Sequence, residues 1–181
     1  MNPFKAAWLI LLLGSSLQAL PLEGFEINLG GGNAWSQGYL LQTGGGLTWH
    51  TVPHQYFAVR SDVRLGTSFT DTPNPWQTDL CALYGWGQHS PSGYLREWAG
   101  VSAALGQREG LLLIEGPSDE YLFGSYTDHY YRNITYLDPG IVAELEAGIP
   151  MGPMEPVGLF LQYNWTQDMP LWTVGIKIRF Y

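Results

Sequence analysis

The last ten residues of the chain, 172–181, alternate between apolar and polar or small side chains as far as Phe180. Because successive side chains of a strand point to opposite faces, this segment predicts a strand with one apolar and one polar face. The apolar face carries Trp172, Val174, Ile176, Ile178 and Phe180, and the other face carries Thr173, Gly175, Lys177 and Arg179. Such a strand suits either a soluble sheet with its apolar face inward or a membrane barrel with that face outward. Which face meets water therefore decides the class of protein.

The first 19 residues have the layout of a secretory signal peptide. Lys5 supplies a positive charge, residues 6–13 form an apolar run, and the small residue Ala19 suits a cleavage site. The apolar run is far shorter than the roughly 20 residues that a helix needs to cross a bilayer. We therefore predict that residues 1–19 are a signal peptide and that residues 20–181 form one domain.

The composition argues against several functional classes. Cys81 is the only cysteine, so no intrachain disulfide can form. A net charge of −8 disfavours nucleic acid as a partner, and the four histidines are too scattered to predict a metal site. The glycine runs 30–32 and 44–46 precede no helix, so they predict no phosphate-binding loop and no cofactor. Charged residues make up 13% of the chain, against about 25% in soluble domains, and there are eight Trp and eleven Tyr. This balance is typical of membrane barrels with aromatic girdles.

Alternation of period two recurs along the chain, whereas no segment keeps a helical period over three turns. The predicted strands are residues 25–30, 39–50, 55–66, 78–88, 94–106, 140–149, 157–166 and 172–180. The links between them differ in length: 32–38, 67–77 and 107–133 are longer than 51–54, 89–93 and 150–156, and the last, 167–170, is a short exception. Long external loops and short periplasmic turns alternate in this way in outer-membrane barrels. The prediction is an all-β fold, an eight-stranded antiparallel up-and-down transmembrane β-barrel.

Fixed charges of both signs fall on the polar faces of these strands. We predict an interior charge network made of Glu26, Arg60, Asp62, Arg64, Glu144, Glu146, Lys177 and Arg179. An eight-stranded barrel is just wide enough to be filled by side chains, and buried charges are tolerated when they are partnered. The network is therefore expected to plug the lumen and fix the register; the alternative is a gated polar pathway. Trp49, Trp86, Trp165 and Trp172 are expected to contact lipid, and Trp98 is not.

Three segments carry a resemblance to a known class. Residues 81–86 (CALYGW), 140–147 (GIVAELEA) with the Pro-rich turn after them, and 174–180 (VGIKIRF) resemble segments of the small outer-membrane β-barrel proteins. This class includes the OmpA transmembrane domain and OmpX, and the likeness is greatest to uncharacterised barrels of Bacteroidetes-type bacteria. The resemblance implies a monomer in the bacterial outer membrane that contacts outer-membrane lipid. It also implies a C-terminal strand read by the barrel-insertion machinery, although the in-phase aromatic is Phe180 and Tyr181 overhangs by one residue.

The predicted function is a structural or surface-interaction role through the external loops, with residues 107–133 as the place where a surface ligand would bind. One alternative is a lipid-A-modifying enzyme that uses His89, with Ser90 or Ser92 and Glu97. These residues lie in or near a short turn that Ser, Pro and Gly explain by themselves, so we predict no enzyme. Two soluble alternatives are an antiparallel sandwich and a periplasmic ligand-binding β-barrel, and the latter requires an apolar lumen.

Overall fold

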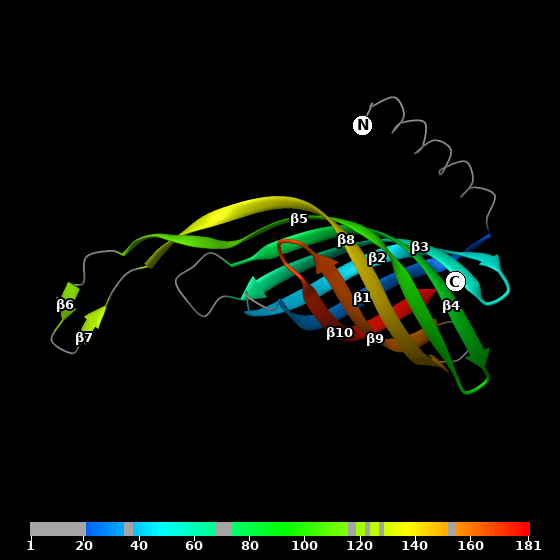
Figure 1. The fold of residues 1–181 in the computed structure, drawn as a ribbon. Coiled ribbons are helices and arrows are strands. Elements are labelled where there is room, and N and C mark those ends of the chain that lie inside the picture. Colours follow the sequence, from blue (N-terminus) through cyan, green and yellow to red (C-terminus); the bar gives the residue numbers. More distant parts are fainter. Residues whose placement is uncertain are drawn as a thin grey trace, which may run out of the picture.

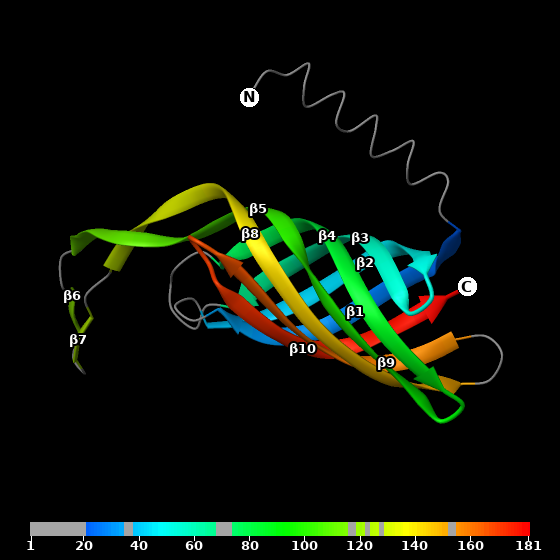
Figure 2. The same ribbon diagram turned by 45° about the vertical axis from the view of Figure 1, so that its right-hand side comes forward.

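The structure, a computed structural model, is a closed antiparallel β-barrel (Figure 1, Figure 2). It describes residues 21–34, 38–67, 74–115, 119–121, 124–126, 129–151 and 155–181, so the predicted signal peptide lies outside the described residues. Around the barrel the strand order is β1, β10, β9, β8, β5, β4, β3, β2, and a separate small sheet pairs β6 with β7. Within these residues no helix is long and apolar enough to cross a membrane.

The strands follow one another up and down, which confirms the predicted fold class. The barrel strands are β1 (Leu22–Ala34), β2 (Gly38–Val52), β3 (Gln55–Thr67), β4 (Trp76–Ser90), β5 (Gly93–Glu115), β8 (His129–Met151), β9 (Glu155–Thr166) and β10 (Leu171–Phe180). The small sheet consists of β6 (Asp119–Tyr121) and β7 (Gly124–Tyr126). Most barrel strands run beyond the limits that the alternation predicts, since main-chain pairing continues where the side-chain pattern has already stopped.

The links divide between the two ends of the barrel. The connections from Val52 to Gln55, from Ser90 to Gly93 and from Met151 to Glu155 join strand ends at the end of the barrel where β1 begins and β10 ends. The other connections join strand ends at the opposite end: Ala34 to Gly38, Thr67 to Trp76, Glu115 to His129 and Thr166 to Leu171. The prediction of a long first link, 32–38, is wrong. The strands stay paired as far as Ala34 and Gly38, and Gly38 has a φ of 85°, a left-handed conformation that glycine adopts easily and that permits a tight connection.

Within the segment 107–133, for which the sequence shows no regular period, the described residues are β-structure in their main chain. β5 and β8 remain paired far past the barrel and form a two-stranded ribbon (Figure 1). Register shifts lie between Glu109 and Leu112 and between Leu112 and Ile114. A register shift breaks the regular pairing of the two strands, so the main chain stays paired here although the sequence shows no period of two.

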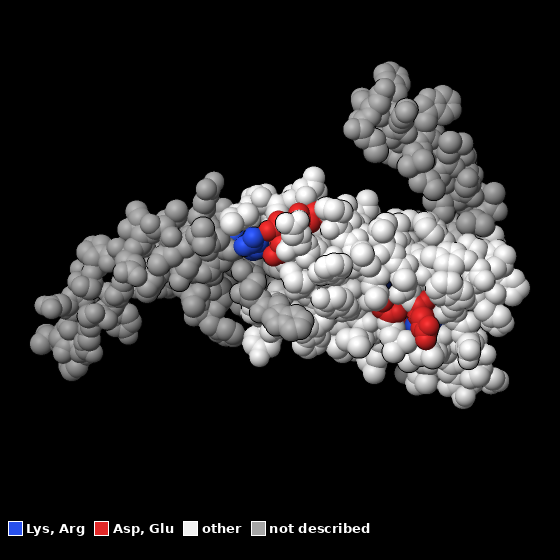
Figure 3. All heavy atoms as spheres, viewed as in Figure 1, with Lys and Arg blue, Asp and Glu red and all other residues white. Residues whose placement is uncertain are grey.

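The apolar faces of the strands point outward and the polar faces inward. On β10, Val174 and Ile176 are 46% and 49% exposed, whereas Lys177 and Arg179 are each 1% exposed. The face in view in Figure 3 shows charged atoms at only two places on the described barrel. A soluble protein does not expose an apolar belt of this extent, so this arrangement excludes the sandwich with its apolar face inside. As predicted, Trp86, Trp165 and Trp172 are exposed and Trp98 is buried. Trp49, which was also expected to face lipid, is half-buried beside Phe57.

Aromatic side chains gather near both ends of the outward belt. Near the end with the chain termini, Phe25 stacks on Phe180 with ring centroids 6.0 Å apart, and Tyr84 lies edge-on to Trp86 at 5.2 Å. Toward the other end lie Tyr39, Trp165 and Trp172, all exposed. Trp172 and Phe180 are eight positions apart on β10. At about 3.3 Å per residue and a tilt of about 40°, they bracket about 20 Å, close to the apolar height of a membrane barrel.

The stagger of the strands fixes how the interior is filled. From Glu97, the path of paired residues around the barrel returns to β5 at Gln107, ten positions farther along the strand. The path runs through Leu145, Leu161, Val174, Gly31, Leu41, Leu65 and Trp76. Eight strands with this stagger enclose an interior about as wide as the side chains that fill it.

Candidate functional site

The eight residues of the predicted charge network all have buried side chains inside the barrel. They are Glu26, Arg60, Asp62, Arg64, Glu144, Glu146, Lys177 and Arg179. They come from β1, β3, β8 and β10, and closure of the barrel brings β1 against β10. Glu26 and Arg179 are paired in the register of these two strands, so the acid and the base enter the lumen side by side.

The part of the network nearest the termini is a cluster of three acids and two bases. Arg179 lies 3.0 Å from a carboxylate oxygen of Glu26 and 2.7 Å from one of Glu146. Lys177 contacts Glu144, and it lies 3.3 Å from Glu146 and 3.7 Å from Glu26. Each charge therefore faces at least one opposite charge, as burial in a medium of low polarity requires.

Arg60 joins this cluster to a second one deeper in the barrel. Its guanidinium lies 2.8 Å from Glu144 and 3.1 Å from Asp62. Arg64 lies 3.7 Å from Asp62 and forms an ion pair with Asp79. Because β3 carries Arg60, Asp62 and Arg64 at every second position, one strand supplies a column of alternating charge along the lumen.

Side-chain amides complete the interior. Gln42 of β2 donates to the amide oxygen of Gln162 of β9 at 3.0 Å, and Asn164 donates to Asp79 at 2.8 Å. The first contact links strands that are separated by β1 and β10, so it crosses the lumen. The amides thus satisfy hydrogen-bonding groups that the ion pairs leave over.

The sequence analysis left out two further buried charges and a partly buried partner. Arg96 of β5 forms a two-pronged contact with Glu23 of β1, at 2.6 and 3.1 Å, and its guanidinium lies 4.1 Å from the centre of the Tyr56 ring. Three strands separate β1 from β5 in either direction, so this ion pair spans the lumen near the termini. The alternation of inward and outward positions could have found both buried charges. Arg96 lies two positions before the inward-facing Trp98, so it shares the inward face of β5, and Asp79 is the inward neighbour of the outward Leu80.

The buried charges balance. The buried acids are Glu26, Asp62, Asp79, Glu144 and Glu146, and the buried bases are Arg60, Arg64, Arg96, Lys177 and Arg179. The chain as a whole carries a net charge of −8. The acidic excess of the protein therefore lies outside this buried set.

The end of the interior away from the termini is apolar. A buried cluster there contains Ala34, Leu40, Ala104, Tyr136, Met169 and Leu171. The Tyr136 hydroxyl donates to Gln77 at 2.7 Å, which connects this cluster to the polar interior. The sequence did not indicate the cluster because Leu40 and Leu171 each have an outward apolar neighbour, so they interrupt the alternation that marks the faces.

Glycines make room for the largest interior rings. Inward-facing aromatic side chains lie opposite glycines in the strand register: Trp98 opposite Gly85, Tyr136 opposite Gly106, Tyr94 opposite Gly148 and Phe160 opposite Gly175. A Cβ atom at Gly85 would lie 2.5 Å from Cε3 of Trp98 and 2.8 Å from the carbonyl oxygen of Glu97. The high glycine content of the polar face thus reflects close packing inside a narrow lumen.

Replacing Gly85 with alanine should lower the free energy of unfolding by about 1–3 kcal/mol, since the added methyl group overpacks against Trp98. Gly31→Ala is the matched control, because a Cβ there meets only the Leu40 carbonyl oxygen at 3.7 Å. Urea unfolding in detergent micelles, followed by tryptophan fluorescence, measures both changes. Equal stability of the two variants would contradict this packing.

The residues that the alternative of a lipid-A-modifying enzyme would use do not assemble into a catalytic group in the described part of the chain. His89 belongs to β4, and its Nε2 lies 3.2 Å from the Tyr56 hydroxyl and 3.2 Å from Arg96. Ser90 donates to the carbonyl of Gly93 at 3.0 Å. Across the described parts of the chain, no hydrogen bond joins His89 to Ser90 or Ser92, and no group of three or more His, Cys, Asp or Glu residues is placed to hold a metal ion.

Comparison with known proteins finds relatives in structure only. No protein-family model matches the chain, and a search of curated proteins finds no match. Neisserial surface protein A aligns over 88% of this chain and 97% of its own length, with a TM-score of 0.59 and 11% identity. The fold is that of the small eight-stranded outer-membrane β-barrels.

A second similar structure is that of Ail, the attachment invasion locus protein of Yersinia pestis, in complex with the heparin analogue sucrose octasulfate. It aligns over 87% of this chain and 96% of its own length, with a TM-score of 0.55 and 8% identity. Identities this low show a shared fold and leave function to be argued from the chain itself.

Proposed function

We propose that this chain is a bacterial outer-membrane protein whose plugged barrel serves as a scaffold and whose ribbon, within residues 107–133, contacts surface ligands or partners. The observation that supports it best is the outward apolar belt around a buried, charge-balanced interior. In outer-membrane barrels the short turns and both termini are periplasmic, which places the ribbon outside the cell. The proposal includes export by a signal peptide at residues 1–19, contact with outer-membrane lipid, insertion through the C-terminal strand and a monomeric barrel.

The interior contacts favour a plug over a conducting pathway. Ion pairs and amides from facing strands meet across the lumen, as in the contact between Gln42 and Gln162. The apolar cluster that contains Met169 and Leu171 occupies the far end. A hydrated path would have to break partnered, buried charges at one end and wet an apolar cluster at the other, and both steps are costly.

The ribbon has the composition of a surface that binds cationic partners. Residues 107–133 contain two bases, Arg108 and Arg132, and five acids, Glu109, Glu115, Asp119, Glu120 and Asp128. They also contain four tyrosines, a residue type that is enriched at interfaces. The balance differs from what a sulfated polymer requires, so the heparin analogue bound by Ail does not carry over to this chain. Among the described residues, β5 has no pairing with β4 beyond Gln107 and β8 has none with β9 before Gly140, so the outer edges of the ribbon offer main-chain groups to an added strand.

Cysteine labelling of intact cells tests the location and orientation together. In a Cys81→Ala background, Glu120→Cys should react with a membrane-impermeant maleimide, because β6 lies between β5 and β8 in the chain, on the side that the proposal assigns to the cell exterior. Ser92→Cys, in the tight link between β4 and β5, should react only after the outer membrane is permeabilised. Labelling of Ser92→Cys alone in intact cells, or recovery of the folded protein in the soluble fraction, would overturn the proposal.

The proposal includes no enzymatic activity, because His89 faces Arg96 and Tyr56, and Ser90 donates to Gly93. Mass spectra of lipid A from cells with and without the protein should be identical. A gain or loss of an acyl chain that depends on the protein would establish the enzymatic alternative.

A further inference from the structure

The carboxylate of Glu97 differs from the other described charges because it lies on the outer surface of the barrel. Among the charged side chains whose placement is described, Glu97 alone is classed as exposed, and it points outward from β5. The others are buried in the lumen or sit partly buried with partners, such as Arg108 and Asp168 at 2.6 Å. Within the described residues Glu97 forms no ion pair or hydrogen bond, so its partner is to be sought outside the protein.

Glu97 lies next to an exposed indole at the edge of the apolar belt. Glu97 and Trp86 are directly paired on β5 and β4, and opposed side chains on one face of a sheet lie about 4.5–5.5 Å apart. Both line a hollow of about 570 Å³ together with His54, Gln88 and Leu95. The main-chain N–H of Gly87 donates to the His54 carbonyl at 2.9 Å, which fixes the 53–54 turn against this part of β4.

These contacts set the depth of Glu97. The 53–54 turn is one of the short links at the end with the termini, and Trp86 packs with Tyr84 in the aromatic girdle at that end. Glu97 therefore lies at the membrane boundary on the periplasmic side, where lipid headgroups meet the barrel.

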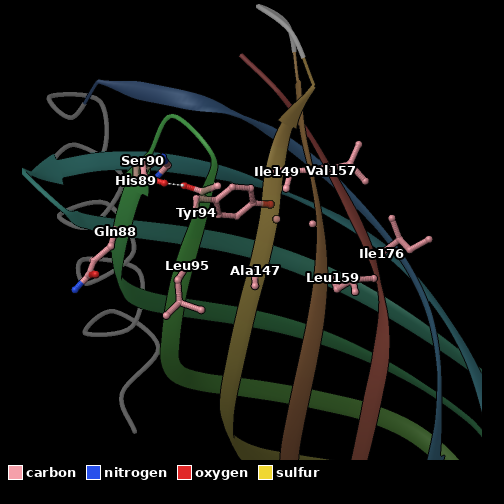
Figure 4. Close-up of a pocket in the computed structure, with 13 residues that line it drawn as sticks. Gln88, His89, Ser90, Tyr94, Leu95, Ala147, Ile149, Val157, Leu159 and Ile176 are labelled. Atoms are coloured by element: carbon pink, nitrogen blue, oxygen red, sulfur yellow. Dashed lines mark hydrogen bonds between the residues drawn. The ribbon is translucent and has the colours of Figure 1, made fainter.

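An apolar groove begins on the other side of Leu95. It has a volume of about 750 Å³ and runs over β5, β8, β9 and β10, where Leu95, Ala147, Leu159 and Ile176 line it (Figure 4). The groove is deep at Ala147, Gly148 and Gly158, because these residues carry little or no side chain. Its other end is polar, with Gln88 and Ser90 beside the link between β4 and β5 (Figure 4). The groove thus leads from the headgroup level into the apolar belt.

We propose that this surface binds a phosphatidylethanolamine-type lipid of the periplasmic leaflet. The Glu97 carboxylate and the face of the Trp86 indole hold the primary ammonium of the headgroup, since both attract a cation. The Gln88 amide is placed to donate to the phosphodiester, and one acyl chain lies in the groove beside Ala147. An anionic headgroup without an amine lacks a partner for Glu97 and is repelled by it. This inference rests on the proposed membrane location.

Native mass spectrometry of the delipidated protein tests this site. The protein in detergent is titrated with phosphatidylethanolamine or phosphatidylglycerol of identical acyl chains. The wild type should retain the former with a preference of roughly 5-fold to 30-fold. Glu97→Gln should abolish the preference, and Glu97→Asp should keep most of it. Ala147→Phe, which fills the groove, should weaken retention of both lipids.

Several outcomes would overturn the inference. Equal retention of the two lipids by the wild type, or an unchanged preference in Glu97→Gln, would show that the carboxylate does not read the headgroup. A dimer that disappears in Glu97→Gln would make a second copy of the chain the occupant instead. Heat-modifiable gel mobility of each variant shows that the barrel is folded, and cysteine labelling tests the membrane location separately, so failure of one proposal does not imply failure of the other.

Discussion

Replacing Glu146 with glutamine should lower the free energy of unfolding by about 3–5 kcal/mol. Its two carboxylate oxygens accept from Arg179 at 2.7 Å and from Lys177 at 3.3 Å. They also accept from the Tyr94 hydroxyl at 2.8 Å and from the Trp98 indole at 3.3 Å. The amide keeps the shape but leaves two buried cations short of one negative charge, and removal of one partner from a buried ion pair is far more costly than removal of both. Urea unfolding in micelles, followed by tryptophan fluorescence, gives the change.

Two further variants separate charge balance from packing. Combining Glu146→Gln with Lys177→Met restores the balance and should recover part of the lost stability. Gln167→Ala, at an exposed position between β9 and β10, should change the free energy of unfolding by less than about 0.5 kcal/mol. If Glu146→Gln were as mild as Gln167→Ala, the interior charges would be hydrated and the lumen would not be plugged.

Much of this fold could be predicted from the sequence because a membrane barrel constrains the residues on both faces of every strand. Lipid requires an apolar residue at each outward position, and the narrow lumen requires a small, polar or partnered residue at each inward one. Val174 through Arg179 show this alternation without interruption, and the structure reproduces it position by position. The contact of Glu26 with Arg179 could also be predicted, since closure pairs the first strand with the last.

The sequence did not indicate two features of the fold: the contacts across the lumen, which depend on the stagger of the strands, and the β5–β8 ribbon, where the alternation of side chains is interrupted. Alternation along a strand does not show which residues of opposite strands lie at the same height in the lumen. The ion pair between Arg96 and Glu23 could therefore be found only once the stagger of the strands was known. The ribbon was also missed, because register shifts near Leu112 interrupt the regular pairing while the main chains of β5 and β8 stay hydrogen-bonded. The unpaired state of Glu97 is likewise visible only when its surroundings are known.

Placing an arginine at Ile176 should destabilise the barrel by about 2–4 kcal/mol in a lipid bilayer. Ile176 is 49% exposed and lies on the outward face of β10 midway between Trp172 and Phe180, at the middle of the apolar belt. A guanidinium there has no water to hydrate it, and the inward acids lie on the other side of the sheet. Reversible unfolding in phospholipid vesicles, followed by tryptophan fluorescence, measures the cost.

Leu137→Arg is the matched control for depth. Leu137 is 73% exposed and lies on β8 three positions beyond Gly140, where pairing with β9 ends, so its substitution should cost at most about 1 kcal/mol. The difference between the two variants measures the membrane, because both add the same side chain to an exposed apolar position. In a water-soluble barrel both substitutions would be nearly neutral, since hydrated arginines are tolerated at exposed positions. Equal, small effects at Ile176 and Leu137 would therefore contradict a transmembrane barrel, whereas a cost that grows toward the middle of the belt requires lipid around it.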